Sequence, residues 1–283
     1  MKIKDLQLKT EVCQWQVKRV ERLRLEEEFE DYSGLIHGIE MHVPYTKWDY
    51  AIDMCKKAKK YQGKKILVSG GDSVNLDMFS YFYRQNNNPA SNLTPLQELS
   101  QLVKFLKYAE TIYDQIVFIM SNHERRLNKF ILRELGELKQ AREALKLMKS
   151  LEDVFDDEGL NKIVFVDDFF IQIGDAIFSH FEKNSSVPGS VARWIVQYLT
   201  PRIEKNWAAC YQFHTHCQLK MPVDRKVVIE CGACVDSLDY WRKGKLAGKG
   251  KMSSIGYGRG EMDKGKLDLE TADFVLKGWE GYL

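Results

Sequence analysis

Short apolar runs alternate with helix-like stretches along most of this chain, and this alternation is the feature that most narrows the folds open to it. Runs rich in Val, Ile and Phe occupy residues 34–42, 64–72, 113–123, 162–180 and 207–216. Helical patterns fall between them, near 47–61, up to residue 111, over 124–154 and near 189–199. Strands that alternate with helices are typical of layered α/β proteins. The sequence therefore predicts an α/β fold built as a layered sandwich.

The domain organisation follows from length and local composition. A chain of 283 residues with 44% hydrophobic content can bury one large core. Residues 1–30 are densely charged and are expected to form an exposed N-terminal arm, with the main domain over 31–283. Within that domain we expect a helical insertion at about 124–160 and a Gly/Lys-rich loop over 241–266.

Charge and hydropathy exclude some classes of protein. The 42 basic and 40 acidic residues leave a net charge of only +2, so the composition does not indicate a protein that coats nucleic acid or another polyanion. No apolar run is long enough to span a bilayer, and residues 1–20 have no signal-peptide pattern. We therefore expect a cytoplasmic protein with no membrane partner.

The six cysteines do not indicate a disulfide scaffold in a chain of this length. Cys231 and Cys234 form a single C-x-x-C motif, which fits a zinc or redox pair less well than two small apolar residues at the end of a strand.

Polar side chains that can bind metal end each of the apolar runs. They are Glu40 and His42, Asp72, Asn122 and His123, His180, and His214 and His216. Five of the six histidines lie at such an end, and only His37 does not. In α/β proteins ligands bind beyond the carboxyl ends of the strands, so residues distant in the sequence can converge there. We expect these side chains to form one site.

The chemistry of this set favours divalent cations. Imidazole, carboxylate and amide oxygen together suit manganese, iron or zinc better than magnesium or calcium. The set exceeds what one tetrahedral zinc needs, whereas two ions ~3.5–4 Å apart would use all of it and clamp a phosphoryl group. Asp72 has two carboxylate oxygens and can bridge the pair. Each residue alone has an ordinary alternative, such as a turn for Asp72 or a helix cap for Asn122, but together they favour a metal site.

The order of these motifs resembles the calcineurin-like metallophosphoesterase superfamily, and its phage and prokaryotic branch most of all. The family motifs are D-x-H, G-D, G-N-H-[DE], a later H and G-H-x-H. Here they correspond to "EMH" at 40–42, "GD" at 71–72, "SNHE" at 121–124, His180 and "FHTH" at 213–216. The resemblance extends from residue 36 to about 235.

The resemblance implies a sandwich fold of the metallophosphoesterase type and two divalent metal ions, manganese first, with iron, zinc or nickel as alternatives. It implies that a hydroxide bridging the ions attacks phosphorus, while His123 protonates the departing oxygen or stabilises its charge. The ligands would divide into two sets, Glu40, His42, Asp72 and His216 for one ion and Asp72, Asn122, His180 and His214 for the other. His214 and His216 would thus bind different ions.

Three residues depart from the family pattern. Glu40 replaces an aspartate, Ser121 replaces the glycine before Asn-His, and Phe213 replaces the glycine before His-x-His. A longer carboxylate and the loss of two flexible backbone positions can alter local geometry. A binding protein with a degenerate metal site therefore stays open as an alternative.

The substrate is less constrained than the chemistry. Arg125, Arg126 and Asn75 are candidates to bind the substrate phosphate, although the two arginines fit a solvated helix face equally well. Eight Lys or Arg and two acids lie between 242 and 266, with aromatic residues among them. A solvated loop is the more common explanation of such a segment, but it would also suit a nucleic-acid partner. We expect a phosphodiesterase of nucleic acid or nucleotide, with a phosphomonoesterase of proteins or nucleotides as the alternative.

Overall fold

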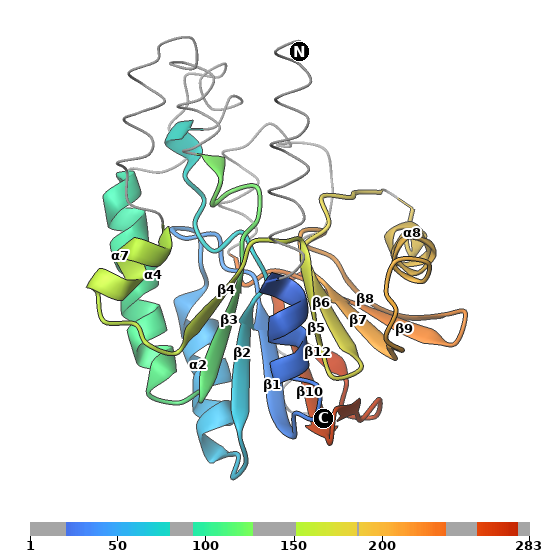
Figure 1. The fold of residues 1–283 in the computed structure, drawn as a ribbon. Helices are drawn as coiled ribbons and strands as arrows, with labels where there is room; N and C mark the ends of the chain where they lie inside the picture. Colours follow the sequence, from blue (N-terminus) through green and yellow to red (C-terminus); the bar gives the residue numbers. More distant parts are fainter. Residues whose placement is uncertain (1–20, 80–92, 127–150, 186, 236–253, 277–283) are drawn as a thin grey trace, which may run out of the picture.

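Two β-sheets pack face to face, and helices cover their outer faces (Figure 1). The computed structural model describes residues 21–79, 93–126, 151–185, 187–235 and 254–276. The strands and helices alternate along the chain as the apolar pattern predicts. The predicted α/β sandwich is therefore confirmed.

The first sheet has seven strands. Its order is β11 (Lys266–Leu267), β10 (Gly256–Asp263), β1 (Gly34–Ile39), β2 (Lys65–Ser69), β3 (Gln115–Ile119) and β4 (Ile163–Val166), and β12 (Asp273–Leu276) also pairs with β10. Strands β1 to β4 are parallel, whereas β10 is antiparallel to β1. The carboxyl ends of four neighbouring strands thus lie along one edge.

The second sheet has five strands. Its order is β5 (Phe170–Ile173), β6 (Ala176–Ser179), β7 (Ala209–Gln212), β9 (Lys226–Cys231) and β8 (Gln218–Val223). The three inner strands β6, β7 and β9 are parallel, and the two edge strands are antiparallel to their neighbours. This arrangement again places several strand ends together.

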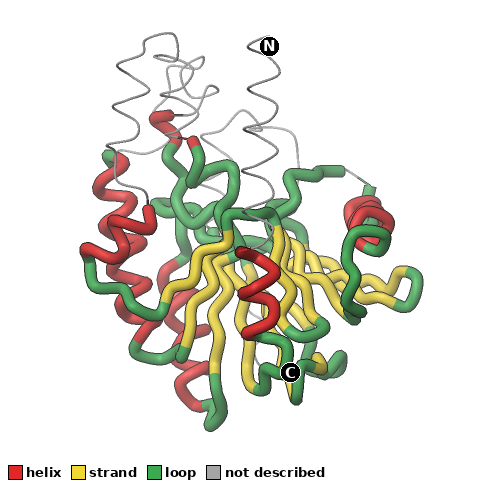
Figure 2. The backbone as a smooth tube through the Cα atoms, in the orientation of Figure 1, coloured by secondary structure: helices red, strands yellow, loops and turns green. Residues whose placement is uncertain are grey.

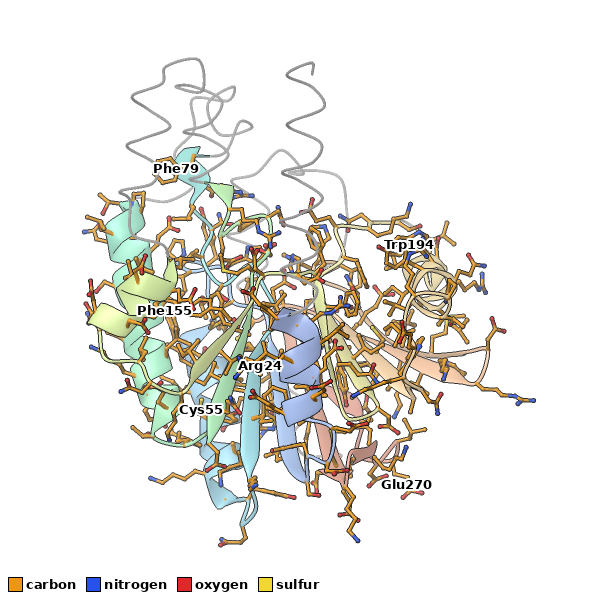
Figure 3. The ribbon with its side chains drawn as sticks, viewed as in Figure 1. Arg24, Cys55, Phe79, Phe155, Trp194 and Glu270 are labelled. Atoms are coloured by element: carbon orange, nitrogen blue, oxygen red, sulfur yellow. The ribbon has the colours of Figure 1, made fainter. Side chains whose placement is uncertain are left out.

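Helices complete the layers on both sides. Within the described residues that follow the N-terminal segment, the helices are α2 (Trp48–Lys60), α4 (Pro95–Glu110), α7 (Leu151–Asp157) and α8 (Ser190–Leu199), with a 3-10 turn η1 at Asp77–Phe79. The first three pack on the first sheet and α8 packs on the second, so that Phe155 and Trp194 lie on opposite sides of the molecule (Figure 3). Among the described residues, none of the helices has the length and apolar character needed to cross a membrane.

The two faces of each strand enter different cores, as the alternation of side chains along a strand requires. On β2, Ile66 and Val68 pack between the sheets, while Leu67 packs toward the helices. Full burial of one such side chain stabilises the fold by ~1.5–3 kcal/mol, so packing in both cores favours this orientation of the strand. The result is a four-layered sandwich.

The N-terminal segment differs from the exposed arm that we expected. Residues 21–28 are helical, but Leu25 and Phe29 pack into the core between the sheets. Arg22 also binds Asp168, with 2.7 Å between Nη1 and Oδ2. The apolar positions on one face of this charged helix explain its attachment to the second sheet. Residues 1–20 lie outside the described residues.

The prediction of a loop over 241–266 is wrong in part, because residues 256–263 form strand β10. A Cβ atom on Gly258 or Gly260 would come within 3.0 Å of the Tyr211 side chain, so glycine lets β10 lie close to it. Residues 236–253 of that loop, and 127–150 of the expected helical insertion, lie outside the described part of the chain. Helix α7 accounts for the described end of the insertion.

Cys231 and Cys234 are both fully buried and not in a disulfide, as expected for small apolar residues.

The buried histidine of β1 should make stability depend on pH. Burial, together with the charges of Arg259 and Lys57, lowers the pKa of His37 to about 3. The unfolded chain binds a proton near pH 6.5 and the folded chain does not, so stability is full above 6.5 and falls as the pH drops toward 3. We expect a loss of ~2 kcal/mol between pH 6.5 and pH 5 from this group.

Urea unfolding at both pH values would measure this loss in the native chain and in His37→Asn. The variant should lose less stability than the native chain over this interval. An equal loss in the two proteins would show that His37 does not cause it.

Candidate metal centre

The loops that follow β1, β2, β3, β6 and β7 gather at one end of the sandwich (Figure 2). They bring together seven of the predicted side chains in three overlapping groups whose candidate ligand atoms lie within 4.8 Å of one another. The groups are Glu40, His42 and His216; His42, Asp72 and His123; and Asp72, His180 and His214. All of these residues except His214 are buried. The structure therefore brings these seven side chains together at the strand ends, where the sequence predicted that they would lie.

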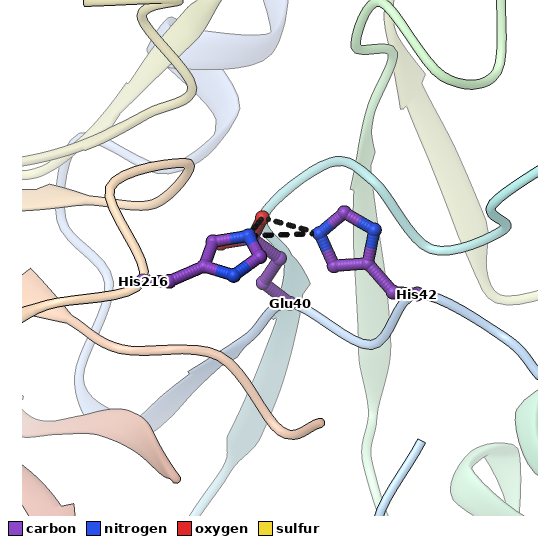
Figure 4. Close-up of side chains that lie close together, drawn as sticks. All are labelled: Glu40, His42 and His216. Atoms are coloured by element: carbon purple, nitrogen blue, oxygen red, sulfur yellow. Dashed lines mark hydrogen bonds and ion pairs between the residues drawn. The ribbon is translucent and has the colours of Figure 1, made fainter. Parts of the chain in front are cut away.

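Glu40, His42 and His216 form the first group (Figure 4). His42 Nε2 lies 2.9 Å from Glu40 Oε1 and 3.0 Å from His216 Nε2. The distance between His216 Nε2 and Glu40 Oε1 is 3.1 Å. Two ligand atoms at right angles around an ion, each ~2.1 Å from it, are separated by ~3.0 Å. The spacing of these three atoms matches that of ligands to one cation.

The ring of His42 is oriented by a contact on its far side. Its Nδ1 lies 3.2 Å from Asn75 Oδ1, and an amide oxygen accepts hydrogen bonds, so Nδ1 carries a proton. In the neutral ring, Nε2 then presents its lone pair to Glu40 and His216. Outer contacts of this kind fix the tautomer of histidines that bind metal. Asn75 thus contacts a candidate ligand, and its expected contact with the substrate stays a prediction.

Asp72 belongs to the second and third groups, and its carboxylate also lies beside His42 of the first. Its Oδ1 lies 3.3 Å from His180 Nε2, and its Oδ2 lies 3.6 Å from His42 Nε2 and 4.0 Å from His214 Nδ1. His180 Nδ1 donates to the Gly70 carbonyl oxygen at 2.6 Å, so Nε2 of the neutral ring presents a lone pair to the carboxylate. One carboxylate therefore faces histidines of all three groups, as a bridging ligand would.

The charges of the cluster call for a cation. Burial alone would raise the pKa of Asp72, but His123 and His180 hold it well below its ordinary value. Burial opposes protonation of His180, yet Asp72 raises its pKa to about 9. Burial, with His180 next, lowers the pKa of His214 to about 4. Buried carboxylates among imidazoles are thus balanced either by protons or by metal ions, and the donor set fits divalent cations.

Asn122 directly precedes His123 in the loop after β3, and its amide oxygen is a candidate ligand. Its Oδ1 is buried and makes no hydrogen bond to the described residues. A buried acceptor without a partner costs free energy, which a metal ion would offset.

Backbone strain supports a functional role for these loops. His42, Asp72, His214 and His216 have positive φ angles of 51°, 48°, 74° and 53°. Such angles are uncommon for residues other than glycine and cost ~1–3 kcal/mol each. They turn the side chains toward the cluster at a cost in stability, and strain of this kind occurs mostly at functional sites.

Each departure from the family pattern has a structural partner. The longer side chain of Glu40 points Oε1 at the imidazoles, while Oε2 accepts a hydrogen bond from the His214 backbone N–H at 2.7 Å. The Phe213 ring fills the space beside two glycines, because a Cβ on Gly38 or Gly70 would lie 2.6 or 2.3 Å from it. Ser121 Oγ accepts from the Asp72 N–H at 2.9 Å. The departures keep the cluster assembled.

The two arginines after His123 are held by acidic partners. Arg125 Nη2 donates to Asp167 Oδ1 at 2.5 Å. Arg126 Nη1 donates to Asp77 Oδ1 at 3.2 Å, and its Nη2 donates to His123 Nε2. A guanidinium only donates, so His123 Nε2 accepts and the ring is neutral. Burial, against the charge of Asp72 and with help from Arg126, lowers the pKa of His123 well below its ordinary value.

Sequence reasoning missed one residue of the centre. Glu124 is buried, and its Oε1 accepts from the Ser73 N–H at 2.6 Å. Its place as the last residue of "SNHE" was the signal that could have identified it.

Replacement of Gly71 by alanine is expected to disrupt the centre. Gly71 has φ +87°, and a Cβ there would lie 2.7 Å from His180 Nδ1 and 2.8 Å from Ser121 Cβ. Strain and overpacking each cost ~1–3 kcal/mol, so we expect a loss of ~3 kcal/mol in urea unfolding. Gly159→Ala is the matched control, since Gly159 has φ +73° with no atom within 4 Å of its Cβ. Equal losses in the two variants would contradict the steric explanation.

Several solved structures match most of this chain at low identity. They include an archaeal phosphodiesterase with 14% identity and a TM-score of 0.41, covering 86% of this chain and 99% of the other. A mutant of Vps29 from Entamoeba histolytica has 12% identity and a TM-score of 0.38, covering 86% and 98%. A predicted phosphoesterase from Streptococcus pneumoniae has 10% identity and a TM-score of 0.34, covering 87% and 98%.

No family model and no curated protein matches the chain. The chemistry of this chain is indicated by the side chains of its own cluster.

Proposed function

We propose that this chain is a phosphoesterase that depends on a pair of divalent metal ions. The observation that carries the proposal is that the Asp72 carboxylate faces two groups of imidazoles at once, through Oδ1 on one side and Oδ2 on the other. Metal pairs bridged in this way bind the attacking and leaving oxygens of a phosphoryl group. The cluster also lies beyond the carboxyl ends of parallel strands, where α/β proteins bind their substrates.

The ligands divide between the two ions as follows in this proposal. One ion takes Glu40, His42, Asp72 and His216, and the other takes Asp72, Asn122, His180 and His214. The division is supported by the distances within the first group and by the tautomer of His180, whose Nε2 faces Asp72. Manganese is the ion that we favour, with iron, zinc or nickel as alternatives, since imidazole and carboxylate ligands suit all of them.

When bound, the metal pair would act as a Lewis acid on the phosphoryl oxygens and generate a nucleophile from water near neutral pH. The protein's own contribution is to hold the ligand atoms in place. The Gly70 carbonyl orients His180, Asn75 orients His42, and Glu40 Oε2 holds the backbone of His214.

His123 is proposed to act on the departing oxygen. Its Nε2 lies 3.6 Å from Asp72 Oδ2 and accepts a hydrogen bond from Arg126. We propose that Arg126 donates to the oxygens of a bound phosphoryl group in place of His123 Nε2, because the planar fork of donors in a guanidinium suits phosphate oxygens. With that donor withdrawn and its charge balanced by phosphate, His123 Nε2 can take up a proton from solvent and then pass it to the departing oxygen, or stabilise the charge of that oxygen.

A phosphodiester of nucleic acid or nucleotide is the substrate that we favour. The support is the excess of basic over acidic residues between 242 and 266, with aromatic residues among them. A phosphomonoester of a protein or nucleotide is the second candidate. A binding protein that holds metal without turnover is the third, favoured by the departures at Glu40 and Ser121.

Hydrolysis of two aryl esters separates these functions. The metal-free chain would be supplied with bis(p-nitrophenyl) phosphate or p-nitrophenyl phosphate, each without metal and with Mn²⁺, Fe²⁺, Zn²⁺ or Ni²⁺ in turn. We expect Mn²⁺-dependent release of p-nitrophenol from the diester. Turnover of the monoester alone would favour the phosphatase, and no turnover with any of the four metals would leave only the binding protein.

A further inference from the structure

Ser121 occupies the centre of a buried hydrogen-bond network around Asp72. The Ser121 Oγ atom accepts from the backbone N–H of Asp72 at 2.9 Å and from that of His123 at 3.2 Å. The same hydroxyl contacts Asp72 Oδ1 and Glu124 Oε2. Both Ser121 and the carboxylate of Asp72 are almost completely buried, so no bulk water competes for these bonds.

Glu124 holds the backbone on both sides of this hydroxyl. Its Oε1 accepts from the N–H of Ser73 at 2.6 Å and from that of Val74 at 3.4 Å, and its Oε2 accepts from the N–H of Ser121 at 3.1 Å. The loop after β2 and the loop after β3 are therefore joined through one buried side chain. Glu124 itself is not within any of the three candidate metal groups found among the described residues.

The consequence is a fixed rotation of the Asp72 carboxylate. With Ser121 on Oδ1, that oxygen stays 3.3 Å from His180 Nε2, and Oδ2 stays 3.6 Å from His42 Nε2. A carboxylate without this contact would have to lose rotational freedom when it binds ions, which costs free energy. Glycine, the family residue at position 121, offers no hydroxyl for the purpose.

We propose that Ser121 and Glu124 are positioning residues that orient Asp72 to bridge two ions and thereby set the metal affinity of this chain. The proposal rests on the proposed function, since it requires that the cluster bind metal. Removal of an outer contact of a metal ligand typically costs roughly 10–100-fold in affinity, and this is the effect expected here.

Calorimetric titration of the metal-free full chain with Mn²⁺ tests the proposal. Ser121→Ala, Ser121→Gly and Glu124→Gln should each bind Mn²⁺ roughly 10–100-fold more weakly than the native chain. Alanine retains the Cβ that lies beside Gly71, whereas glycine removes it. Equal weakening by both substitutions is therefore the result expected if the hydroxyl matters, and weakening by glycine alone would overturn the proposal.

Glu98→Gln is the matched control. Glu98 is as well buried as Glu124 and accepts from the Leu76 N–H at 2.8 Å in the same loop, but belongs to none of the candidate metal groups. Its replacement should leave the affinity unchanged, and equal weakening would mean that any loop contact matters. Thermal melts in EDTA would show that the metal-free variants fold.

The two proposals fail in different ways. If the native chain binds Mn²⁺ and the Ser121 and Glu124 variants bind it equally tightly, only the positioning role is wrong. If the native chain binds no divalent ion, both are wrong.

Discussion

Asp72→Ala is expected to abolish both metal binding and hydrolysis. Asp72 is the residue that faces both groups, with carboxylate oxygens 3.3 Å from His180, 3.6 Å from His42 and 3.6 Å from His123. Without it, the proposed ligand sets retain four imidazoles and a single carboxylate, Glu40, and two bound cations would repel each other without a shared anion. We expect a loss of affinity greater than the ~100-fold that removal of an outer contact can cause.

Metal content after dialysis against Mn²⁺ and the rate on an aryl diester would measure this effect. Asp175→Ala is the control, because Asp175 is also buried and accepts from the Leu267 N–H at 2.7 Å, outside the cluster. The control should keep metal and activity. A full metal content in Asp72→Ala would contradict the bridging role.

His123→Ala is expected to retain the ions and to lose most of the turnover. His123 is outside the two proposed ligand sets, yet its Nε2 lies 3.6 Å from Asp72 Oδ2. Proton transfer by a positioned side chain contributes typically ~10²–10⁴-fold to a rate, so a loss of this size is expected. The loss should be larger for a diester with a poor leaving group than for an activated aryl diester, because the poor leaving group depends more on protonation.

Metal analysis and rates on the two diesters would test this role. His37→Asn replaces a buried histidine outside the cluster and should leave both quantities unchanged. An unchanged rate of His123→Ala on the poor leaving group would exclude His123 as the acid, and loss of the ions would place it among the ligands.

Most of the strands could be predicted from local patterns. The apolar run at 34–42 contains β1 at Gly34–Ile39, and the helix expected near 189–199 is α8 at Ser190–Leu199. The candidate ligands could also be predicted to converge, because the carboxyl ends of neighbouring parallel strands lie together. This rule identified residues of five separate loops without any knowledge of the fold.

The pairing of strands could not be predicted in this way. The single run at 162–180 contributes β4 to the first sheet and β5 and β6 to the second. Nothing in a local pattern distinguishes these partners, since pairing is decided by packing between distant segments. Strand β10 was missed because its glycines favour a loop locally, while in the fold they allow close contact with Tyr211.

The contacts that orient the candidate ligands were also beyond sequence reasoning. Arg126 contacts His123 and Asp77, whereas Asn75 contacts His42, and both contacts depend on how the loops meet. Ser121 looked like a departure from the family pattern and has a network of its own in the structure. Residue types at strand ends predict a metal site, but only the fold shows what holds the ligands.

Crystals of the native chain grown with Mn²⁺, measured at the manganese absorption edge, test the central claim most directly. We expect two anomalous peaks ~3.5–4 Å apart, as in other two-metal sites. Both peaks should lie within bonding distance of the Asp72 carboxylate, with Glu40, His42 and His216 around one and Asn122, His180 and His214 around the other. A single peak, or peaks that do not share Asp72, would contradict the metal pair.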